Sequence, residues 1–187
     1  MGSNKVHLTG FESVSKELRR MRSQQEPAIA QAIKDTAIFG QIAAVDAVFN
    51  RYGFKSKSYV DDNIKVEVEP RWLMARVYSR YRASTLTRFV NTRRTRNAKT
   101  KPARQVSAGY SISVLRNQSN IFRGAFQFTG RNGNSLMAIR EKGDNSWRDI
   151  QQAAYGPSVA GSFGVIRPKI DEKISDYLRK RYNKHMK

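Results

Sequence analysis

Hydrophobic positions along the chain follow a helical spacing first and a strand spacing later. Over residues 11–22 apolar side chains recur every three or four positions, which predicts a short amphipathic helix. A longer helical run starts at Glu26-Pro27, where proline suits the first turn, and stops at Gly53. Its apolar positions are Ile29, Ile33, Ala37, Gly40, Ala44, Val48 and Tyr52. Because many of its other positions are alanine, this helix suits either packing on a sheet or contact with another subunit.

Past this helix the spacing changes to two, which is typical of strands with one face in water. The alternation predicts strands over residues 64–69, 73–82 and 106–115. Tyr78 and Tyr81 lie three apart in the second of them, so we expect them on opposite faces and not as one base-stacking platform.

The last third of the chain predicts a hairpin and then a helix. Residues 125–128 and 136–139 flank the turn 130–133, which is typical of a β-hairpin. Helical spacing returns from Ile166, with Pro168 in the first turn and basic residues in the last. The whole order predicts an α+β fold: an antiparallel sheet packed by a long helix of the N-terminal half and a C-terminal helix. The length suits a single domain over 1–187.

Acidic residues are absent from the middle of the chain. The 187 residues carry 35 Lys and Arg against 15 Asp and Glu, a formal charge of +20. Residues 70–140 hold fifteen Lys and Arg and no acid, so most of the excess charge lies there. A solvated surface normally mixes both signs. The segregation therefore indicates an anionic partner, with nucleic acid favoured over a membrane surface.

The densest cationic run is residues 93–104, which have almost no apolar side chains. With nothing to bury, this run predicts a long exposed basic loop at 92–105. Arginine matches phosphate well, so we predict sequence-independent nucleic-acid contacts there, with a solvated loop that has no target as the alternative. The predicted contact residues are Arg93, Arg94, Arg96, Lys99, Lys101 and Arg104.

Candidates for catalysis or metal binding are few. His7 and His185 lie near opposite ends, in regions expected to be mobile, and neither has a second ligand at helical spacing. The chain has no cysteine and no Gly-rich phosphate loop. We therefore expect no enzymatic activity, no cofactor and no metal. We also expect synthesis in the cytoplasm without a membrane anchor, because no apolar stretch of about 18 residues and no secretory signal occur.

Two close acid pairs bear on a metal nuclease, which would need converging carboxylates. Asp61-Asp62 is expected in the first turn of a short helix capped by Ser58. Glu67 and Glu69 are expected on the wet face of their strand. This arrangement disfavours a nuclease.

The C-terminal third resembles the minor tail protein Z family, the tail completion proteins of lambda-like long-tailed phages. The resemblance rests on four parts in order over residues 121–187: a Gly-Ala-Phe run, an Asn-Gly turn, an apolar strand ending in Arg140, and Tyr-Gly-Pro-Ser-Val before a basic helix. We interpret these residues as scaffold, with Gly124 allowing a close strand approach and Gly156-Pro157 fixing the path into the last segment. The motif residues are Gly124, Ala125, Phe126, Asn132, Gly133, Tyr155, Gly156, Pro157 and Ser158.

The resemblance implies a structural virion protein without enzymatic activity. It implies a place at the head-proximal end of a phage tail, reached by assembly in the host cytoplasm, as a tail completion or head–tail connector component. The implied partners are further copies of the chain in a ring of six, the tail terminator and other tail or connector proteins, phage DNA and the tape-measure protein. The alternative function is a free, sequence-independent nucleic-acid-binding protein, RNA-binding or ribosome-associated, which explains the charge equally well.

Overall fold

The computed structural model describes residues 25–94, 109–139 and 153–186. The chain forms two compact units, each built from separate stretches. The helical unit comprises Met1–Phe49, Lys57–Arg82 and Ser158–Lys187, and the β unit comprises Asn50–Ser56 and Ala83–Pro157. The predicted helix over 11–22 lies outside the described residues, and the single domain over 1–187 stays a prediction.

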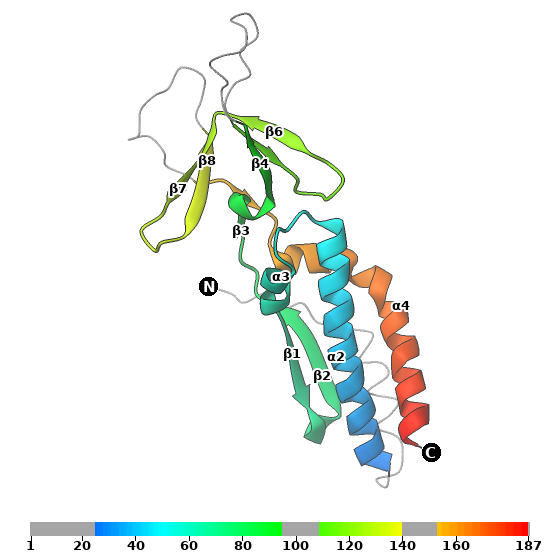
Figure 1. The fold of residues 1–187 in the computed structure, drawn as a ribbon. Helices are drawn as coiled ribbons and strands as arrows, with labels where there is room; N and C mark the ends of the chain where they lie inside the picture. The colour runs from blue at the N-terminus through cyan, green and yellow to red at the C-terminus, as the bar shows by residue number, and fades with distance from the viewer. Residues whose placement is uncertain (1–24, 95–108, 140–152, 187) are drawn as a thin grey trace, which may run out of the picture. The chain divides into compact units, whose positions relative to one another are not determined.

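The described part of the helical unit contains the long helices α2 and α4 and the β1–β2 hairpin (Figure 1). Helix α2 spans Glu26–Arg51, which confirms the predicted helix, and it buries one stripe of its surface: Ile29, Ala32, Ile33, Thr36, Ala37, Gly40, Ala44, Val45 and Val48. Gly40 marks where three elements meet, because a Cβ there would lie 3.5 Å from Ile174 Cδ1 on α4 and 3.7 Å from Val77 Cγ2 on β2. The small residues of α2 therefore allow close packing on both neighbours.

The hairpin consists of β1 (Ile64–Glu69) and β2 (Met74–Ser79), which pair antiparallel, and a 3₁₀ turn at Pro70–Trp72 joins them. The predicted alternation is confirmed in β2, where Ala75, Val77 and Ser79 are buried between less buried neighbours. The strand ends earlier than predicted, so Tyr81 lies beyond it and is 68% exposed.

The short helix α3 (Lys57–Asn63) precedes β1 and is anchored by the buried Val60. It begins before Ser58, so the prediction that Ser58 caps it was wrong. Asp61-Asp62 consequently lies in its second half and not in its first turn. Starting at Lys57 lengthens this very short helix, which adds backbone hydrogen bonds before the strand begins at Ile64.

Helix α4 spans Val159–His185 and begins earlier than predicted. The Ser158 hydroxyl caps it by accepting a hydrogen bond from the Gly161 N–H at 2.9 Å. Pro168 therefore lies inside the helix and not in its first turn. A proline here removes one backbone hydrogen bond and crowds the carbonyl four residues earlier, and Figure 1 shows α4 changing direction along its orange part. Beyond the proline the helix buries Ile170, Ile174 and Leu178.

The described part of the β unit contains three small antiparallel sheets. The largest has the order β4-β5-β6, with β4 at Val90–Arg94, β5 at Gly109–Ile112 and β6 at Asn120–Arg123. Strand β3 (Ser84–Thr85) pairs with β9 (Tyr155–Gly156), and the 3₁₀ turn η3 (Leu86–Phe89) leads from β3 into β4. In the core of the β unit, the ring centroids of Phe54 and Phe89 lie 4.5 Å apart.

The third sheet is the predicted hairpin, which the structure confirms as β7 (Ala125–Thr129) and β8 (Ser135–Ile139). Its turn is closed by hydrogen bonds from the Gly130 N–H to the Asn134 carbonyl and from the Gly133 N–H to the Gly130 carbonyl. Gly133 has a φ of 73°, a left-handed conformation that favours glycine.

The fold is α+β: the N-terminal-half helix and the C-terminal helix pack on an antiparallel sheet, here the β1–β2 hairpin. Within residues 25–94, 109–139 and 153–186, the helices are too short or too polar to cross a membrane.

Candidate nucleic-acid interface

The positive charge of the chain is concentrated in the β unit. By sequence this unit has fifteen Lys and Arg against three acids, a net of +12, whereas the larger helical unit has twenty against twelve, a net of +8. The described part of the β unit contains no Asp or Glu at all. Its cations are Arg51, Lys55, Arg88, Arg93, Arg94, Arg116, Arg123 and Arg131.

The structure changes the boundaries of the predicted basic loop. Arg93 and Arg94 belong to β4, where they pair with Tyr110 and Gly109 of β5, so the prediction that both lie in a loop was wrong. The antiparallel ladder continues to these residues because β5 supplies partners for their backbone groups. Arg96, Lys99, Lys101 and Arg104 lie outside the described residues. The segment that carries them joins two neighbouring strands of one sheet.

Backbone contacts in the β unit bring together cations that lie far apart in the sequence. The Arg116 N–H donates to the Arg51 carbonyl at 3.0 Å, and the Lys55 N–H donates to the Arg88 carbonyl at 2.9 Å. These four side chains are exposed. In the β4-β5-β6 sheet, Arg94 and Arg123 are both register partners of Gly109, one on each side.

The β4-β5-β6 sheet has one apolar and one polar face. Tyr110 and Ile112 of β5 are buried and Phe122 of β6 is half-buried, all on the face that points to the core of the unit. The other face carries Thr92, Ser111, Ile121 and Arg123, of which three are exposed and Ser111 is half-buried. The Ser111 and Ser119 hydroxyls are hydrogen-bonded to each other at 2.6 Å. We call this second face the polar sheet face.

The family-like motif residues occupy structural positions. Gly124 has a φ of 72° at the corner where the chain leaves β6 and enters β7, which explains a glycine there by backbone conformation. Ala125 is buried and Phe126 half-buried in β7, and Asn132 and Gly133 lie in the β7–β8 turn.

The second motif leads from the β unit into α4. Tyr155 and Gly156 form β9, and a Cβ on Gly156 would lie 2.5 Å from the Phe89 ring, so this position has room only for glycine. Pro157 follows, and Ser158 caps α4. These contacts give the motif a packing and capping role.

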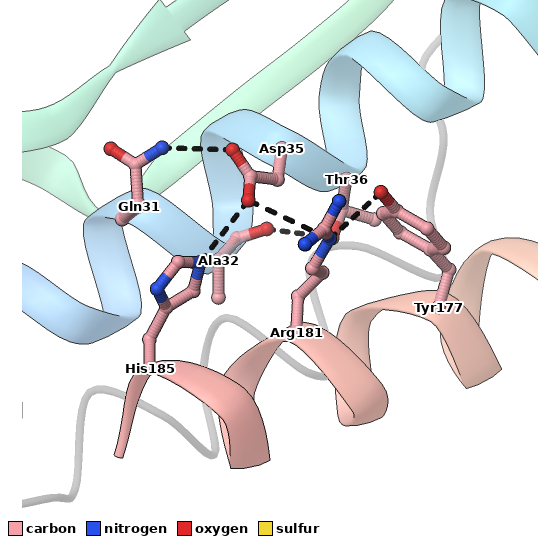
Figure 2. Close-up of polar contacts among 7 residues, drawn as sticks. All are labelled: Gln31, Ala32, Asp35, Thr36, Tyr177, Arg181 and His185. Carbon is pink, nitrogen blue, oxygen red and sulfur yellow. Dashed lines mark hydrogen bonds and ion pairs between the residues drawn. The ribbon is translucent and has the colours of Figure 1, made fainter. Parts of the chain in front are cut away.

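A polar cluster in the helical unit joins α2 to α4 (Figure 2). The Asp35 carboxylate lies 3.1 Å from His185 Nε2 and 3.6 Å from Arg181 Nε, and Gln31 Nε2 donates to it at 2.8 Å. Arg181 Nε also donates to the Tyr177 hydroxyl at 2.8 Å. His185 was expected in a mobile region, and this was wrong: it lies within α4 and has a partner, because the helix runs to the end of the described chain.

The neighbours of Asp35 set its ionisation. Burial alone would raise the pKa of this carboxyl, but hydrogen bonds from His185 and Gln31 and the nearby Arg181 guanidinium together lower it below its ordinary value. Asp35 is therefore held as a carboxylate, with the Arg181 guanidinium of α4 as the nearby cation. The cluster thus joins α2 to α4 through residues that are 150 positions apart in the sequence.

Two of the four acids lie beside other residues in the structure. Glu67 of β1 is the cross-strand partner of Arg76, and Asp61 accepts a long hydrogen bond of 3.5 Å from Gln41 Nε2. In the part of the chain that the structure describes, no three His, Asp or Glu residues are grouped closely enough to hold a metal ion.

The sequence reasoning missed Arg123 and the polar sheet face as a candidate site. In the sequence Arg123 directly precedes the Gly-Ala-Phe motif, and only the strand register shows that it shares a row with Arg94. The pairing of Asp35 with His185 was also missed, because no local spacing links residues of two separate helices. Compared with known proteins, the chain matches no family model, no curated protein and no solved structure.

Proposed function

We propose that this chain is a structural, non-enzymatic virion protein that completes a phage tail at its head-proximal end. In this proposal several copies form a ring, six by the symmetry of such tails, and the β unit of each copy faces DNA. Assembly takes place in the host cytoplasm, and the neighbouring proteins are the tail terminator and other connector proteins.

The observation that carries the proposal is the composition of the β unit. Its described residues combine eight cations with no acid, and its strands and backbone contacts bring three pairs of them together from distant parts of the sequence: Arg51 with Arg116, Lys55 with Arg88, and Arg94 with Arg123. Like charges held close together repel unless a polyanion neutralises them. A ring of such units would multiply that repulsion, so a position around or beside nucleic acid suits it.

The family-like motif supplies the second line of support. Its residues lie at a left-handed corner, at a tight hairpin turn, against the Phe89 ring and at a helix cap. Residues with such roles fix a backbone, and none of them offers a reactive group for catalysis. A resemblance based on scaffold residues therefore favours a structural protein over an enzyme.

The proposal is tested in a phage that carries this gene. Mass spectrometry of purified virions should detect the chain, and deletion of the gene should leave filled heads and separate tails in electron micrographs. A variant with Arg93, Arg94, Arg96, Lys99, Lys101 and Arg104 all changed to Gln should form tails that join heads poorly. The control variant has six exposed cations of the helical unit changed to Gln, and its tails should join heads as well as wild-type tails do. These six residues are Lys34, Lys65, Arg71, Lys169, Lys173 and Lys180.

The charge of the β unit also suits a free nucleic-acid-binding protein, and the same experiment separates the two functions. A chain that is absent from virions, with normal head–tail joining after deletion, would refute the tail assignment and leave the free binding protein. Normal joining by the variant with six changes in and beside residues 93–104 would refute only the role of that segment.

A further inference from the structure

We propose that the polar sheet face, defined above on β4-β5-β6, binds the phosphate backbone of nucleic acid, with Arg123 as its main cation. The proposal rests on the DNA contact in the proposed function and names a surface for it outside residues 95–108. The contact is made with phosphate oxygens and is therefore independent of base sequence.

Strand alternation places the donors of this face side by side. Thr92 of β4 is the register partner of Ser111 of β5, which in turn faces Ile121 of β6. Arg123 lies two positions beyond Ile121, so both point to the same side of the sheet. Thr92, Ile121 and Arg123 are all exposed, whereas Tyr110 and Ile112 on the opposite face are buried. The sheet thus shows one face to water, and that face carries hydroxyl and guanidinium donors.

The hydroxyl pair on this face keeps a donor for a ligand. When two serine hydroxyls hydrogen-bond to each other, one proton is used between them and the second remains to be donated outward. Ser111 and Ser119 form such a pair at 2.6 Å. Thr92 adds another hydroxyl in the neighbouring strand. Hydroxyl and arginine donors are the side chains that proteins use to hold phosphate oxygens.

Gly109 separates the two arginine positions of the row. Neighbouring strands lie roughly 4.8 Å apart, so the Arg94 and Arg123 backbones are separated by roughly 10 Å, with only Gly109 between them. A side chain at Gly109 is excluded, because its Cβ would lie 2.2 Å from the Phe122 carbonyl oxygen. Because β5 packs closely on β6, no side chain from the neighbouring position of β5 can cover Arg123.

The composition of the face favours nucleic acid over a protein partner. Protein–protein interfaces are rich in aromatic residues and poor in serine at their centres. The polar sheet face has the opposite composition, with Thr92, Ser111 and Ser119 around a single exposed apolar side chain, Ile121. The described β unit also has no acid that would repel a phosphate.

The first test measures the salt dependence of binding with the full-length protein. The probes are a fluorescein-labelled 25-bp duplex of mixed sequence and a 25-mer of oligothymidylate, followed by anisotropy between 50 and 400 mM NaCl. Binding weakens as salt rises, so a plot of log association constant against log salt concentration has a negative slope. The change Arg123→Gln should make this slope shallower by about 0.9 on the duplex and by about 0.7 on the single strand. At 0.1 M salt this change in slope corresponds to duplex binding about eight-fold weaker than that of the wild type. Arg71→Gln, an identical charge change in the helical unit, should change the slope by less than half as much.

The second test adds charge to the same face and cannot succeed through misfolding. Ile121 is 49% exposed in β6, and Ile38 is 45% exposed on α2 of the helical unit. Ile121→Lys should steepen the slope by about 0.9 on the duplex, whereas Ile38→Lys should leave it close to the wild-type value. Thr92→Val, which removes a hydroxyl at constant shape, should weaken binding without changing the slope.

The outcomes separate this proposal from the proposed function. If the wild type binds with a steep slope, but Arg123→Gln matches Arg71→Gln and Ile121→Lys matches Ile38→Lys, the polar sheet face is refuted and another part of the chain holds the DNA. If the wild type binds neither probe at 50 mM salt, the DNA contact fails in both proposals, while the virion assignment is still decided by mass spectrometry. If poly-L-glutamate binds as tightly as the duplex and loses affinity in the same variants, an acidic protein replaces nucleic acid as the partner.

Discussion

Gly53 is the residue at which a single added methyl group should cost the most. A Cβ at this position would lie 1.8 Å from the Ser113 carbonyl oxygen and 2.9 Å from its carbonyl carbon. Both atoms belong to the backbone, so the clash cannot be relieved by rotating a side chain. Gly53→Ala therefore forces the segment after α2 away from the strand end at Ser113 by about 1.2 Å before an acceptable contact is reached.

The loss of stability follows from the backbone hydrogen bonds that join the end of α2 to the segment after β5. The Gly53 N–H donates to the Val114 carbonyl at 3.0 Å, and the Arg116 N–H donates to the Arg51 carbonyl at the same distance. Losing or stretching both bonds costs about 1 kcal/mol each, and the displacement of packed neighbours adds about 1–3 kcal/mol. We expect Gly53→Ala to lower the free energy of unfolding by roughly 3–5 kcal/mol. For a chain of this size that is a fall of roughly 6–20 °C in the melting temperature.

A second glycine provides the matched control. Gly164 lies inside α4, and a Cβ there would meet no atom within 4 Å. Gly164→Ala is the same chemical change and reduces the entropy of the unfolded chain by the same amount. In a helix interior it should stabilise the protein by about 0.5–1 kcal/mol. The two variants should thus move the stability in opposite directions.

The measurement is urea unfolding followed by far-UV circular dichroism, with thermal melts as a second readout. If Gly53→Ala is as stable as the wild type, or shifts in the same direction as Gly164→Ala, the close approach of Gly53 to Ser113 is wrong. Loss of folding by Gly53→Ala at 25 °C, with normal folding of Gly164→Ala, would agree with the upper end of the expected range.

Three further predictions concern the motif and the Asp35 cluster. Gly156→Ala should destabilise the protein by about 1–3 kcal/mol, because its Cβ would lie 2.5 Å from the Phe89 ring. Phe89 is fully buried, so Phe89→Leu is itself destabilising. Combining Gly156→Ala with Phe89→Leu should therefore cost less stability in thermal melts than the sum of the two single changes, and an additive loss would refute the clash. Ser158→Ala should cost about 0.5–2 kcal/mol by removing the cap of α4, and Ser158→Asp, which can also cap, should restore most of it in urea unfolding. Asp35→Asn should destabilise the protein more at pH 7 than at pH 2. The folded-state pKa of Asp35 lies below its ordinary value of 3.8, so its contribution is fully present above that value and is lost as the pH falls through the folded-state pKa. An equal difference between the wild type and Asp35→Asn at both pH values would contradict this.

The sequence predicted the elements whose signal is local. The alanine-rich helix from Glu26, the alternating strand at Ile64–Glu69 and the β7–β8 hairpin with its glycine turn were each recognisable from the spacing of apolar residues. A helix or a hairpin of this kind buries one face that its own residues define, so a window of ten to fifteen residues contains the information.

Element boundaries depended on contacts that the sequence does not display. Pro168 marked a helix start by its usual preference, yet α4 continues through it because Ser158 caps an earlier first turn and the buried side chains on either side hold the bend. Arg93 and Arg94 had the composition of a loop, yet β5 provides backbone partners for both. In both cases tertiary structure outweighed local preference. The hydrogen bond missing at Pro168, or the repulsion between neighbouring cations in β4, costs less free energy than apolar burial and strand pairing contribute.

For the candidate site, the sequence by itself determined that the charge is segregated, that residues 70–140 hold no acid, and that the chain offers few groups for catalysis. Only the tertiary structure decided which cations lie in one row of the sheet. Arg94 and Arg123, twenty-nine positions apart, fall in one row because β5 lies between their strands. Asp35 meets His185 for the same kind of reason, across two helices. Charge is a property of each residue and can be counted along the chain, whereas a binding face depends on strand register, which is fixed by which side of every strand is buried.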